Sequence, residues 1–283
     1  MSLNIRMQLS QSVITILVIL TIIALTALTI HKVTQAKGKQ HTTNKIAAQA
    51  KTIFVDKSYM ETVISDSSYF HRMNKADLLA RSISSQQGYI KLYTDSLQTF
   101  SASEKKTLRD LIKQASTYIA PYKNLSSLDW KLIKISSNIE MGWPHTLGDV
   151  IILSATFFEL PKGKQLTTII HEQIHVYQRA FPIETNRLIE SWDFKILNRM
   201  ENISLARNNP DLNSFVYGRG ETEYVQLYNS PTPKDLADSS PSSKEGEHPY
   251  EMMASLLPTL ITSEKTSLTP NEKTTTEWMI KYL

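Results

Sequence analysis

The stretch TTIIHEQIHVYQRAF, residues 167–181, carries two histidines four positions apart, His171 and His175, with Glu172 directly after the first. Apolar residues around them recur at helical spacing and predict one buried face, formed by Leu166, Ile170, Ile174 and Tyr177. The histidines fall on a different face, one helical turn apart. The stretch therefore predicts an amphipathic helix that presents two imidazoles side by side.

Two imidazoles at this spacing can reach one metal ion, because a zinc–nitrogen bond is about 2.0–2.1 Å long. Glu172 projects beside such an ion, where it is poorly placed as a ligand and well placed to accept a proton from water. This is the chemistry of the HExxH motif of zinc hydrolases. The alternative is a surface helix whose two histidines are solvated and whose glutamate is an ordinary helix former.

A catalytic zinc ion needs a third protein ligand and an open position for water. The extended motif HExxHxxGxxH is absent, because the chain continues HVYQRAFPI after the second histidine. A glutamate from a later element is the other solution. The candidates are Glu184, Glu190, Glu221, Glu223, Glu247 and Glu251.

Glu251, in EHPYEMMASLL, is the favoured third ligand. Pro249 suits the first turn of a helix, so the carboxylate leaves a rigid segment. The buried face of that helix is predicted to consist of Met252, Met253, Leu256 and Leu257. Glu251 lies outside that stripe, although an acidic residue is also common near any helix N-terminus. Glu190 is the alternative ligand, and Asp193 could bind the metal or orient a histidine.

A hydrolase also needs a group that stabilises the oxyanion. Tyr217 and Tyr224, in the segment FVYGRGETEYVQLYNS, are the catalytic candidates for this role. Tyr228, His145 and Arg219 are further candidates. For each tyrosine the alternative is a half-buried packing residue.

An HExxH helix followed by a downstream helix glutamate resembles the gluzincin division of zinc metallopeptidases. The segments PHTLGDVIIL and HPYEMMA also resemble an uncharacterised gluzincin-like group. The resemblance covers about residues 130–260 and implies a zinc ion held by His171, His175 and Glu251, with Glu172 as the base. It also implies a zincin-like fold, in which the edge strand of a small sheet binds peptide.

The gap of 76 residues between His175 and Glu251 is longer than in thermolysin-like enzymes. A third ligand at the shorter, thermolysin-type spacing would be Glu190. The third ligand therefore stays open between these two glutamates, with Glu251 preferred.

The N-terminal segment Val13–Ile30, VITILVILTIIALTALTI, has eighteen residues and no charge. A helix of this length spans about 27 Å, close to the apolar thickness of a bilayer. It predicts a single-pass membrane anchor, preceded by a tail at 1–12 and followed by a polar stalk at 31–50. The side of the membrane on which the rest of the chain lies stays open. A cleaved signal peptide and a buried core helix are the alternatives.

Local patterns predict a domain over 51–283, with a helical part at 51–125 and a catalytic part at 126–262. Ser101 and Glu104 form a capping-box pattern, and a short helix begins near Asn74. LDWKLIKIS and DVIILSATFF predict strands with a turn at GWPHTLG between them, whereas ETNRLIESWDFKIL predicts a helix. HPYEMMASLLP predicts a short helix between Pro249 and Pro258, and the capping-box pattern of Thr269 and Glu272 predicts the start of a last helix. Residues 205–248 are expected to be mostly loop.

The chain has 31 basic and 27 acidic side chains, a formal net charge of +4, and no cysteine. Such a mild excess, without a Lys/Arg-rich block, speaks against a nucleic-acid partner. The absence of cysteine removes disulfides, thiol nucleophiles and thiolate ligands. The expected partners are a peptide or protein substrate and, through the N-terminal helix, a membrane.

These observations predict an α+β, zincin-like and mostly helical fold with a small sheet before the active-site helix. The predicted function is that of a membrane-anchored zinc metallohydrolase, most simply a peptidase, with Zn2+ as cofactor. The alternative is a non-catalytic, membrane-tethered interaction protein with a chance or structural metal site. Turnover of a peptide separates the two.

Overall fold

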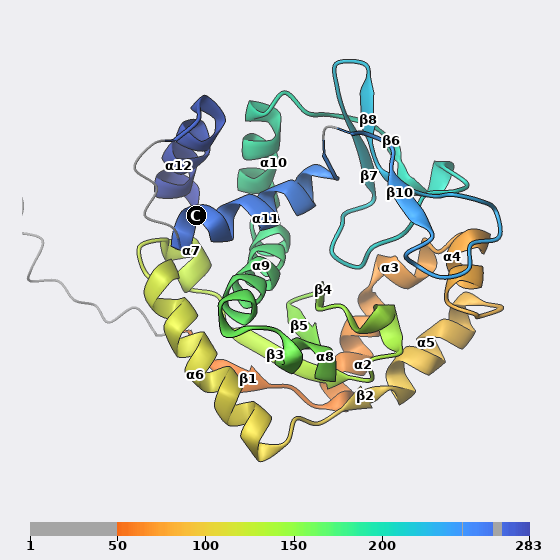
Figure 1. The fold of residues 1–283 in the computed structure, drawn as a ribbon, viewed down its shortest axis with the longest axis horizontal. Coiled ribbons are helices and arrows are strands. Elements are labelled where there is room, and N and C mark those ends of the chain that lie inside the picture. Colours follow the sequence, from red (N-terminus) through yellow and green to blue (C-terminus); the bar gives the residue numbers. More distant parts are fainter. Residues whose placement is uncertain (1–49, 245, 263–267) are drawn as a thin grey trace, which may run out of the picture. The chain divides into compact units, whose positions relative to one another are not determined.

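The computed structural model describes residues 50–244, 246–262 and 268–283 (Figure 1). Helices and small sheets are mixed along this part of the chain, which confirms the α+β expectation. The expected N-terminal tail, membrane anchor and nearly all of the stalk lie outside the described residues. Within these, no helix is long and apolar enough to cross a membrane.

The main sheet has five strands: β1 (Thr52–Phe54), β2 (Leu97–Gln98), β3 (Trp130–Ile135), β4 (His145–Leu147) and β5 (Val150–Leu153). β1, β3 and β5 are parallel to one another. β4 is antiparallel to β5 and forms the edge, with His145 opposite Ile152. β5 is buried throughout, as its run of β-branched residues predicts.

The part at 51–125 is helical, as expected, apart from the short strands β1 and β2. Its helices are α2 (Lys57–Asp66), α3 (Ser68–His71), α4 (Lys75–Ala80), α5 (Gln86–Asp95), α6 (Ala102–Ile119) and α7 (Lys123–Ser126). The capping box of Ser101 and Glu104 is present, and α4 begins after the cap Asn74. Both predictions are confirmed because caps are local interactions between neighbours in sequence.

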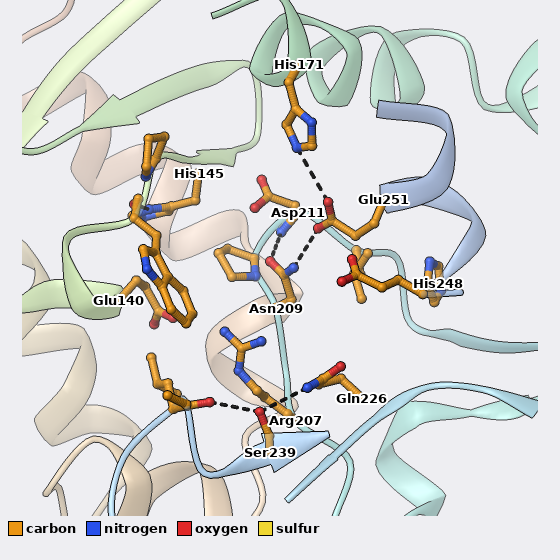
Figure 2. Close-up of a pocket in the computed structure, with 17 residues that line it drawn as sticks. Glu140, His145, His171, Arg207, Asn209, Asp211, Gln226, Ser239, His248 and Glu251 are labelled. Carbon is orange, nitrogen blue, oxygen red and sulfur yellow. Dashed lines mark hydrogen bonds and ion pairs between the residues drawn. The ribbon is translucent and has the colours of Figure 1, made fainter. Parts of the chain in front are cut away.

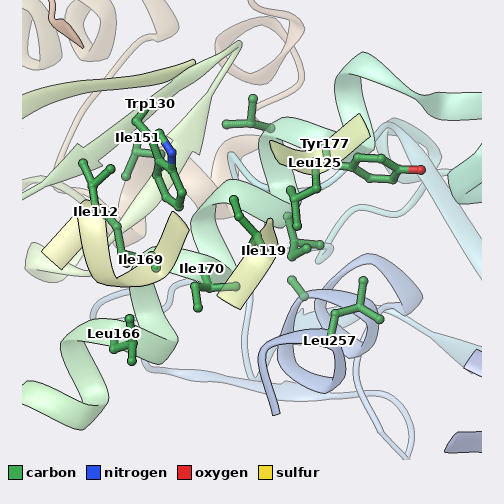
Figure 3. Packing of buried hydrophobic residues seen from close by; sticks show 14 of the residues in the cluster. Ile112, Ile119, Leu125, Trp130, Ile151, Leu166, Ile169, Ile170, Tyr177 and Leu257 are labelled. Atoms are coloured by element: carbon green, nitrogen blue, oxygen red, sulfur yellow. The ribbon is translucent and has the colours of Figure 1, made fainter. Parts of the chain in front are cut away.

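The two faces of the sheet pack against different helices, because side chains alternate along a strand. Ile151 contacts the apolar cluster that contains α6 and the motif helix α9 (Lys162–Ala180) (Figure 3). Ile152 contacts a second cluster, built with α2, α3 and α5. The predicted apolar face of α9 is buried, namely Leu166, Ile170, Ile174 and Tyr177.

The structure differs from the sequence-based prediction in the bounds of three local elements. After Leu153 the chain forms a helix, α8 (Ala155–Glu159), because the Ser154 side chain caps it by accepting from the Thr156 N–H. The expected turn GWPHTLG contains the edge strand β4. The helix predicted through residue 197 is α10 (Pro182–Ser191), which ends before Asp193, whose φ of 63° is left-handed.

Residues 205–248 contain more strand than expected. β6 (Lys195–Arg199) pairs with β7 (Phe215–Arg219), which pairs with β8 (Thr222–Tyr224), and β9 (Gln226–Tyr228) pairs with β10 (Ser239–Pro241). A short 3₁₀ helix, η2 (Met200–Asn202), follows β6, and another, η1 (Ile139–Gly142), precedes β4. Strands of three to five residues carry little periodicity of their own, and pairing partners decide them.

Two helices complete the chain. α11 (Pro249–Thr262) begins where expected but continues through Pro258 rather than ending there. α12 (Pro270–Tyr282) has the predicted capping box of Thr269 and Glu272. α11 lies against α9 through Met253, Ala254 and Leu257, which are fully buried (Figures 1 and 3).

Candidate metal centre

Three side chains converge on one point between α9 and α11: His171, His175 and Glu251, called here the His–Glu cluster. Figure 2 shows two of them, His171 and Glu251. The Nε2 atoms of the two histidines are 3.1 Å apart. Glu251 Oε2 lies 3.4 Å from the first nitrogen and 3.5 Å from the second. Ligands of a tetrahedral zinc ion are about 3.3 Å from one another, given zinc–ligand bonds of about 2.0–2.1 Å. The three donor atoms therefore fit a single metal ion.

The position of Glu251 follows from the packing of α11. Met253 and Leu257 of the predicted stripe are buried against α9, whereas Met252 and Leu256 are half-buried. Glu251 stands outside that stripe in the first turn, and its side chain is 15% exposed. Within the described ranges no other group of three His, Asp or Glu side chains brings its ligand atoms together in this way.

A glutamine on the motif helix orients His175. Gln178 Nε2 donates to the carbonyl oxygen of Tyr250 at 2.9 Å, and its Oε1 lies 2.8 Å from His175 Nδ1. Because Oε1 can only accept, His175 Nδ1 is the donor. In the neutral ring, the form that binds a metal ion, the other nitrogen, Nε2, then has its lone pair directed at the centre. Such a partner is a usual feature of metal-binding histidines.

An asparagine orients Glu251. Asn209 Nδ2 donates to Glu251 Oε1 at 2.7 Å, which leaves Oε2 facing the histidines (Figure 2). The amide is itself fixed, because Asn209 Oδ1 accepts from the backbone N–H of Asp211 at 2.9 Å. The carboxylate is thus held to offer one oxygen to the centre.

The charges at the centre attract a cation. Burial lowers the pKa of His171, but the hydrogen bond to Glu251 and the charge of Glu172 outweigh it and raise the pKa to about 9. Burial would raise the pKa of Glu251, but the charge of His175 and the hydrogen bonds from both histidines hold it well below its usual value. Positive charge is therefore stabilised at this point.

Glu172 lies beside the cluster, and its carboxylate is hydrogen-bonded to Thr146. It is 3% exposed, and its Oε2 accepts from Thr146 Oγ1 of the edge strand at 2.8 Å. Burial, together with the negative charge of Glu251, raises the pKa of Glu172 to about 7. A carboxylate with that pKa can accept and release a proton near neutral pH.

Two cavities meet at the cluster, and both are lined by Pro144 and His171. The larger, about 450 Å³, also contains Glu251 and Arg207 (Figure 2). The smaller, about 370 Å³, contains Glu172. Both volumes are in the range of small-molecule and peptide sites.

The predicted catalytic tyrosines do not line either cavity. Tyr217 OH accepts from Asn213 Nδ2 at 2.8 Å, and its ring lies behind His248, with centroids 5.0 Å apart. Tyr224 is buried, and its OH accepts from Arg219 Nη2 at 2.9 Å. The structure therefore places both in the packing of the β6–β7–β8 sheet and away from the His–Glu cluster.

The other candidates for an oxyanion group are engaged elsewhere. Tyr228 OH donates to Asp77 Oδ1 at 2.9 Å. His145 lines the larger cavity, but its Nδ1 donates to the Trp143 carbonyl at 2.9 Å and its Nε2 accepts from Tyr93 OH at 2.7 Å. Neither residue offers a free donor to the centre in this arrangement.

The alternative third ligands lie apart from the histidines. Glu190 and Asp193 are exposed and line a different cavity with Tyr217. Of the remaining glutamates, Glu247 alone lines the larger cavity; Glu184, Glu221 and Glu223 line neither cavity at the cluster.

The edge strand β4 is tied to the site through Thr146. Its backbone N–H donates to Asp211 Oδ1 at 2.6 Å, and its carbonyl accepts from Arg179 Nη2 at 3.1 Å. The resemblance implied an edge strand that pairs with peptide, yet both backbone groups of Thr146 already have side-chain partners. An extended peptide would have to displace them to pair at this residue.

The sequence analysis assigned no function to several residues of the site: Thr146, Gln178, Arg207, Asn209 and Asp211. Gln178 could have been found, because it lies three positions after His175 on the same helix. The others come from strand and loop segments whose approach to α9 depends on the whole fold.

Comparison of this chain with protein-family models, with curated proteins and with solved structures finds no match. The function is therefore inferred from the chain's own side chains. The site offers two nitrogen donors and one carboxylate oxygen at metal-ligand spacing, with a second, proton-accepting carboxylate beside them.

Proposed function

We propose that this protein is a zinc-dependent hydrolase that cleaves peptide bonds, with a zincin-like fold of gluzincin type. The observation that carries the proposal is the convergence of two Nε2 atoms and one carboxylate oxygen within 3.1–3.5 Å. His171, His175 and Glu251 would hold the ion. When bound, zinc polarises a carbonyl group and lowers the pKa of water.

Glu172 is the proposed general base and acid. Thr146 holds its Oε2, which leaves Oε1 to accept a proton from the attacking water. The protonated carboxyl then gives that proton to the amine nitrogen of the departing fragment. A pKa of about 7 suits both steps, since proton uptake and release are then nearly balanced.

The zincin-like assignment is supported by the arrangement around α9. The helix packs against one face of the sheet, and β4 is an antiparallel edge strand that contacts it through Thr146 and Glu172. The third ligand comes from a later helix, as in the gluzincin pattern.

The decisive experiment measures zinc and turnover together. Full-length protein and its Glu172→Gln variant should each hold about one zinc per chain by elemental analysis, and His175→Ala should hold none. Hydrolysis of a mixed peptide pool should fall at least ~10²-fold in Glu172→Gln, because only the base is removed. Glu190→Gln is the matched control and should keep zinc and activity. Zinc binding without any peptide turnover by the wild type would favour the non-catalytic interaction protein instead.

The anchor belongs to the same proposal. Val13–Ile30 is long and uncharged enough to hold the enzyme in a membrane as a single-pass protein. Full-length protein should stay with membranes after a carbonate wash, and a variant without residues 1–35 should not. A mature chain that begins after Ile30 and is found in the medium would identify a signal peptide.

A further inference from the structure

Arg207 lines the larger cavity, and among the described residues its side chain makes no hydrogen bond or ion pair. Figure 2 shows Arg207 in the same cavity as His171 and Glu251. The guanidinium carbon lies 5.2 Å from the centre of the Trp143 ring, which fixes its position. Its Nε atom is buried and has no hydrogen-bond partner. In the described part of the chain, its guanidinium forms no ion pair within 4.0 Å.

Three other largely buried arginines of the described residues have protein partners. Arg72 donates to Ser214 Oγ and to the Leu212 carbonyl oxygen, although its Nε, like that of Arg207, has no partner. Arg81 is paired with Glu140 and Asp77. Arg179 donates to three backbone carbonyl oxygens. A guanidinium nitrogen that is buried without a partner is costly, unless a ligand supplies the missing acceptor. Among these four arginines only Arg207 makes no side-chain hydrogen bond or ion pair, and it lines the cavity, so it is suited to bind an anion.

Three of the four carboxylates that line this cavity have other partners. Glu140 accepts from Arg81, Asp211 accepts from Thr146, and Glu251 belongs to the His–Glu cluster. The fourth, Glu247, forms no ion pair with Arg207 within 4.0 Å; burial raises the pKa of Glu247, and the charge of Arg207 acts against that rise. A bound molecule can therefore supply the acceptor for Arg207, and a planar carboxylate matches a guanidinium best.

On the basis of the proposed hydrolase function, we propose that Arg207 binds the C-terminal carboxylate of a peptide substrate, so that the enzyme removes residues from peptide C-termini. The edge strand favours an end-anchored substrate, because the backbone groups of Thr146 are taken by Asp211 and Arg179. A peptide therefore gains little from strand pairing there, and a fixed charge at its end sets its register instead. β9 and β10 form the wall near Arg207, through Gln226 and Ser239.

The test measures binding in the Glu172→Gln background, which prevents turnover. Calorimetry compares acetyl-trialanine with its C-terminal amide, on the zinc-loaded and the zinc-depleted protein. The free acid should bind about 10-fold or more tightly, the usual strength of a charge-assisted bidentate contact. Adding Arg207→Gln should make acid and amide bind equally. Arg199→Gln, an exposed arginine, is the matched control and should keep the preference.

A second pair of peptides separates the source of the carboxylate. Acetyl-Ala-Glu-Ala-amide and acetyl-Ala-Gln-Ala-amide differ only in a side-chain carboxylate, and they should bind alike. A preference for the glutamate peptide, with none for the free terminus, would overturn the C-terminal assignment. Equal binding of acid and amide before Arg207 is changed would overturn the whole proposal.

Failure of this proposal is distinguishable from failure of the proposed function. In the active enzyme, Arg207→Gln should raise KM for free-acid peptides and leave the kinetics of the amides unchanged. Peptide hydrolysis with no preference for free acids would support the proposed hydrolase function and contradict the proposed role of Arg207. An Arg207-dependent preference in a protein that hydrolyses nothing would leave a carboxylate-binding site without the proposed chemistry.

Discussion

Two polar clusters reach the larger cavity, the first through Glu140 and the second through His171 and Glu251, and they are built in opposite ways. In the first, called the Arg81 cluster, Arg81 Nε lies 2.9 Å from Glu140 Oε1, and its Nη1 lies 3.2 Å from Asp77 Oδ1. Tyr69 and Tyr89 also donate to Glu140. Every charge there has an opposite charge and several hydrogen bonds. In the His–Glu cluster the positive charge beside Glu251 is a proton on His171, whose pKa is raised to about 9, and a metal ion can take the place of that proton.

The contrast shows what distinguishes a structural cluster from a binding site. Taking charges out of water is costly in both places. The Arg81 cluster offsets that cost internally, so it can hold α4, the turn at Glu140 and the loop at Asn208 together. That loop lies between Arg207 and Asn209, so the structural cluster also positions two residues of the site. The His–Glu cluster is balanced only by an exchangeable proton, so a cation that binds the same three atoms can replace it.

The largest expected effect breaks the Arg81 cluster. Arg81→Met leaves the carboxylates of Glu140 and Asp77 buried without their partner, and the free energy of unfolding should fall by about 3–5 kcal/mol. Urea unfolding followed by circular dichroism measures it. Arg199→Met, at an exposed position, should change stability by less than about 0.5 kcal/mol. A loss below about 1 kcal/mol for Arg81→Met would show that the cluster does not hold the fold together.

The second effect is the acid dependence that Glu140 gives to the Arg81 cluster. Burial would raise the pKa of Glu140, but the charge and hydrogen bonds of Arg81 outweigh it and lower the pKa to about 2, from an ordinary 4.5. A group whose pKa is lower in the folded than in the unfolded chain stabilises the fold at pH values above its unfolded pKa. That stability is lost as the pH falls from about 4.5 towards 2.

The ionised Glu140 contributes about 3 kcal/mol to the free energy of unfolding through this shift. Urea midpoints at pH 5, 4 and 3 should therefore fall more steeply in the wild type than in Glu140→Gln. Parallel slopes for the two proteins would contradict the assigned shift.

The third effect belongs to the His–Glu cluster alone. Zinc at one hundred times its dissociation constant should stabilise the wild type by about 2.7 kcal/mol. Thermal melts with zinc and after chelation measure the difference. His175→Ala and Glu251→Ala should lose the stabilisation yet remain folded, because the apolar residues that pack α11 against α9 are unchanged. Equal zinc stabilisation of Glu251→Ala and wild type would remove Glu251 from the site.

The smallest effect tests orientation rather than ligation. Gln178→Ala frees His175 Nδ1 from its partner, and zinc affinity should fall about 10–100-fold. Competition with a fluorescent zinc chelator measures the constant. Gln173→Ala is the matched control, because Gln173 is buried on the same helix and bonds the Leu128 carbonyl without touching a histidine. A similar loss of zinc affinity in both variants would point to a general disturbance of α9.

The sequence by itself determined those features whose interactions are local. The apolar spacing around Ile170 and Ile174 predicted the buried face of α9, and capping boxes such as that of Ser101 marked helix starts. The HExxH spacing placed His171 and His175 one turn apart, because a helix fixes the positions of residues i and i+4. The short strands between 205 and 248 escaped prediction, since strand pairing joins segments that are distant along the chain.

Only the tertiary structure decided what completes the site. Six glutamates were candidates for the third position, and the docking of α11 onto α9 brought Glu251 to the histidines while Glu190 stayed at the surface. The same packing placed Asn209 and Arg207 at the cavity and kept Tyr217 and Tyr224 away from it. A metal centre needs donor atoms within about 3–4 Å of one another. Spacing in sequence sets such distances within one helix, and between helices they depend on the packing of the whole core.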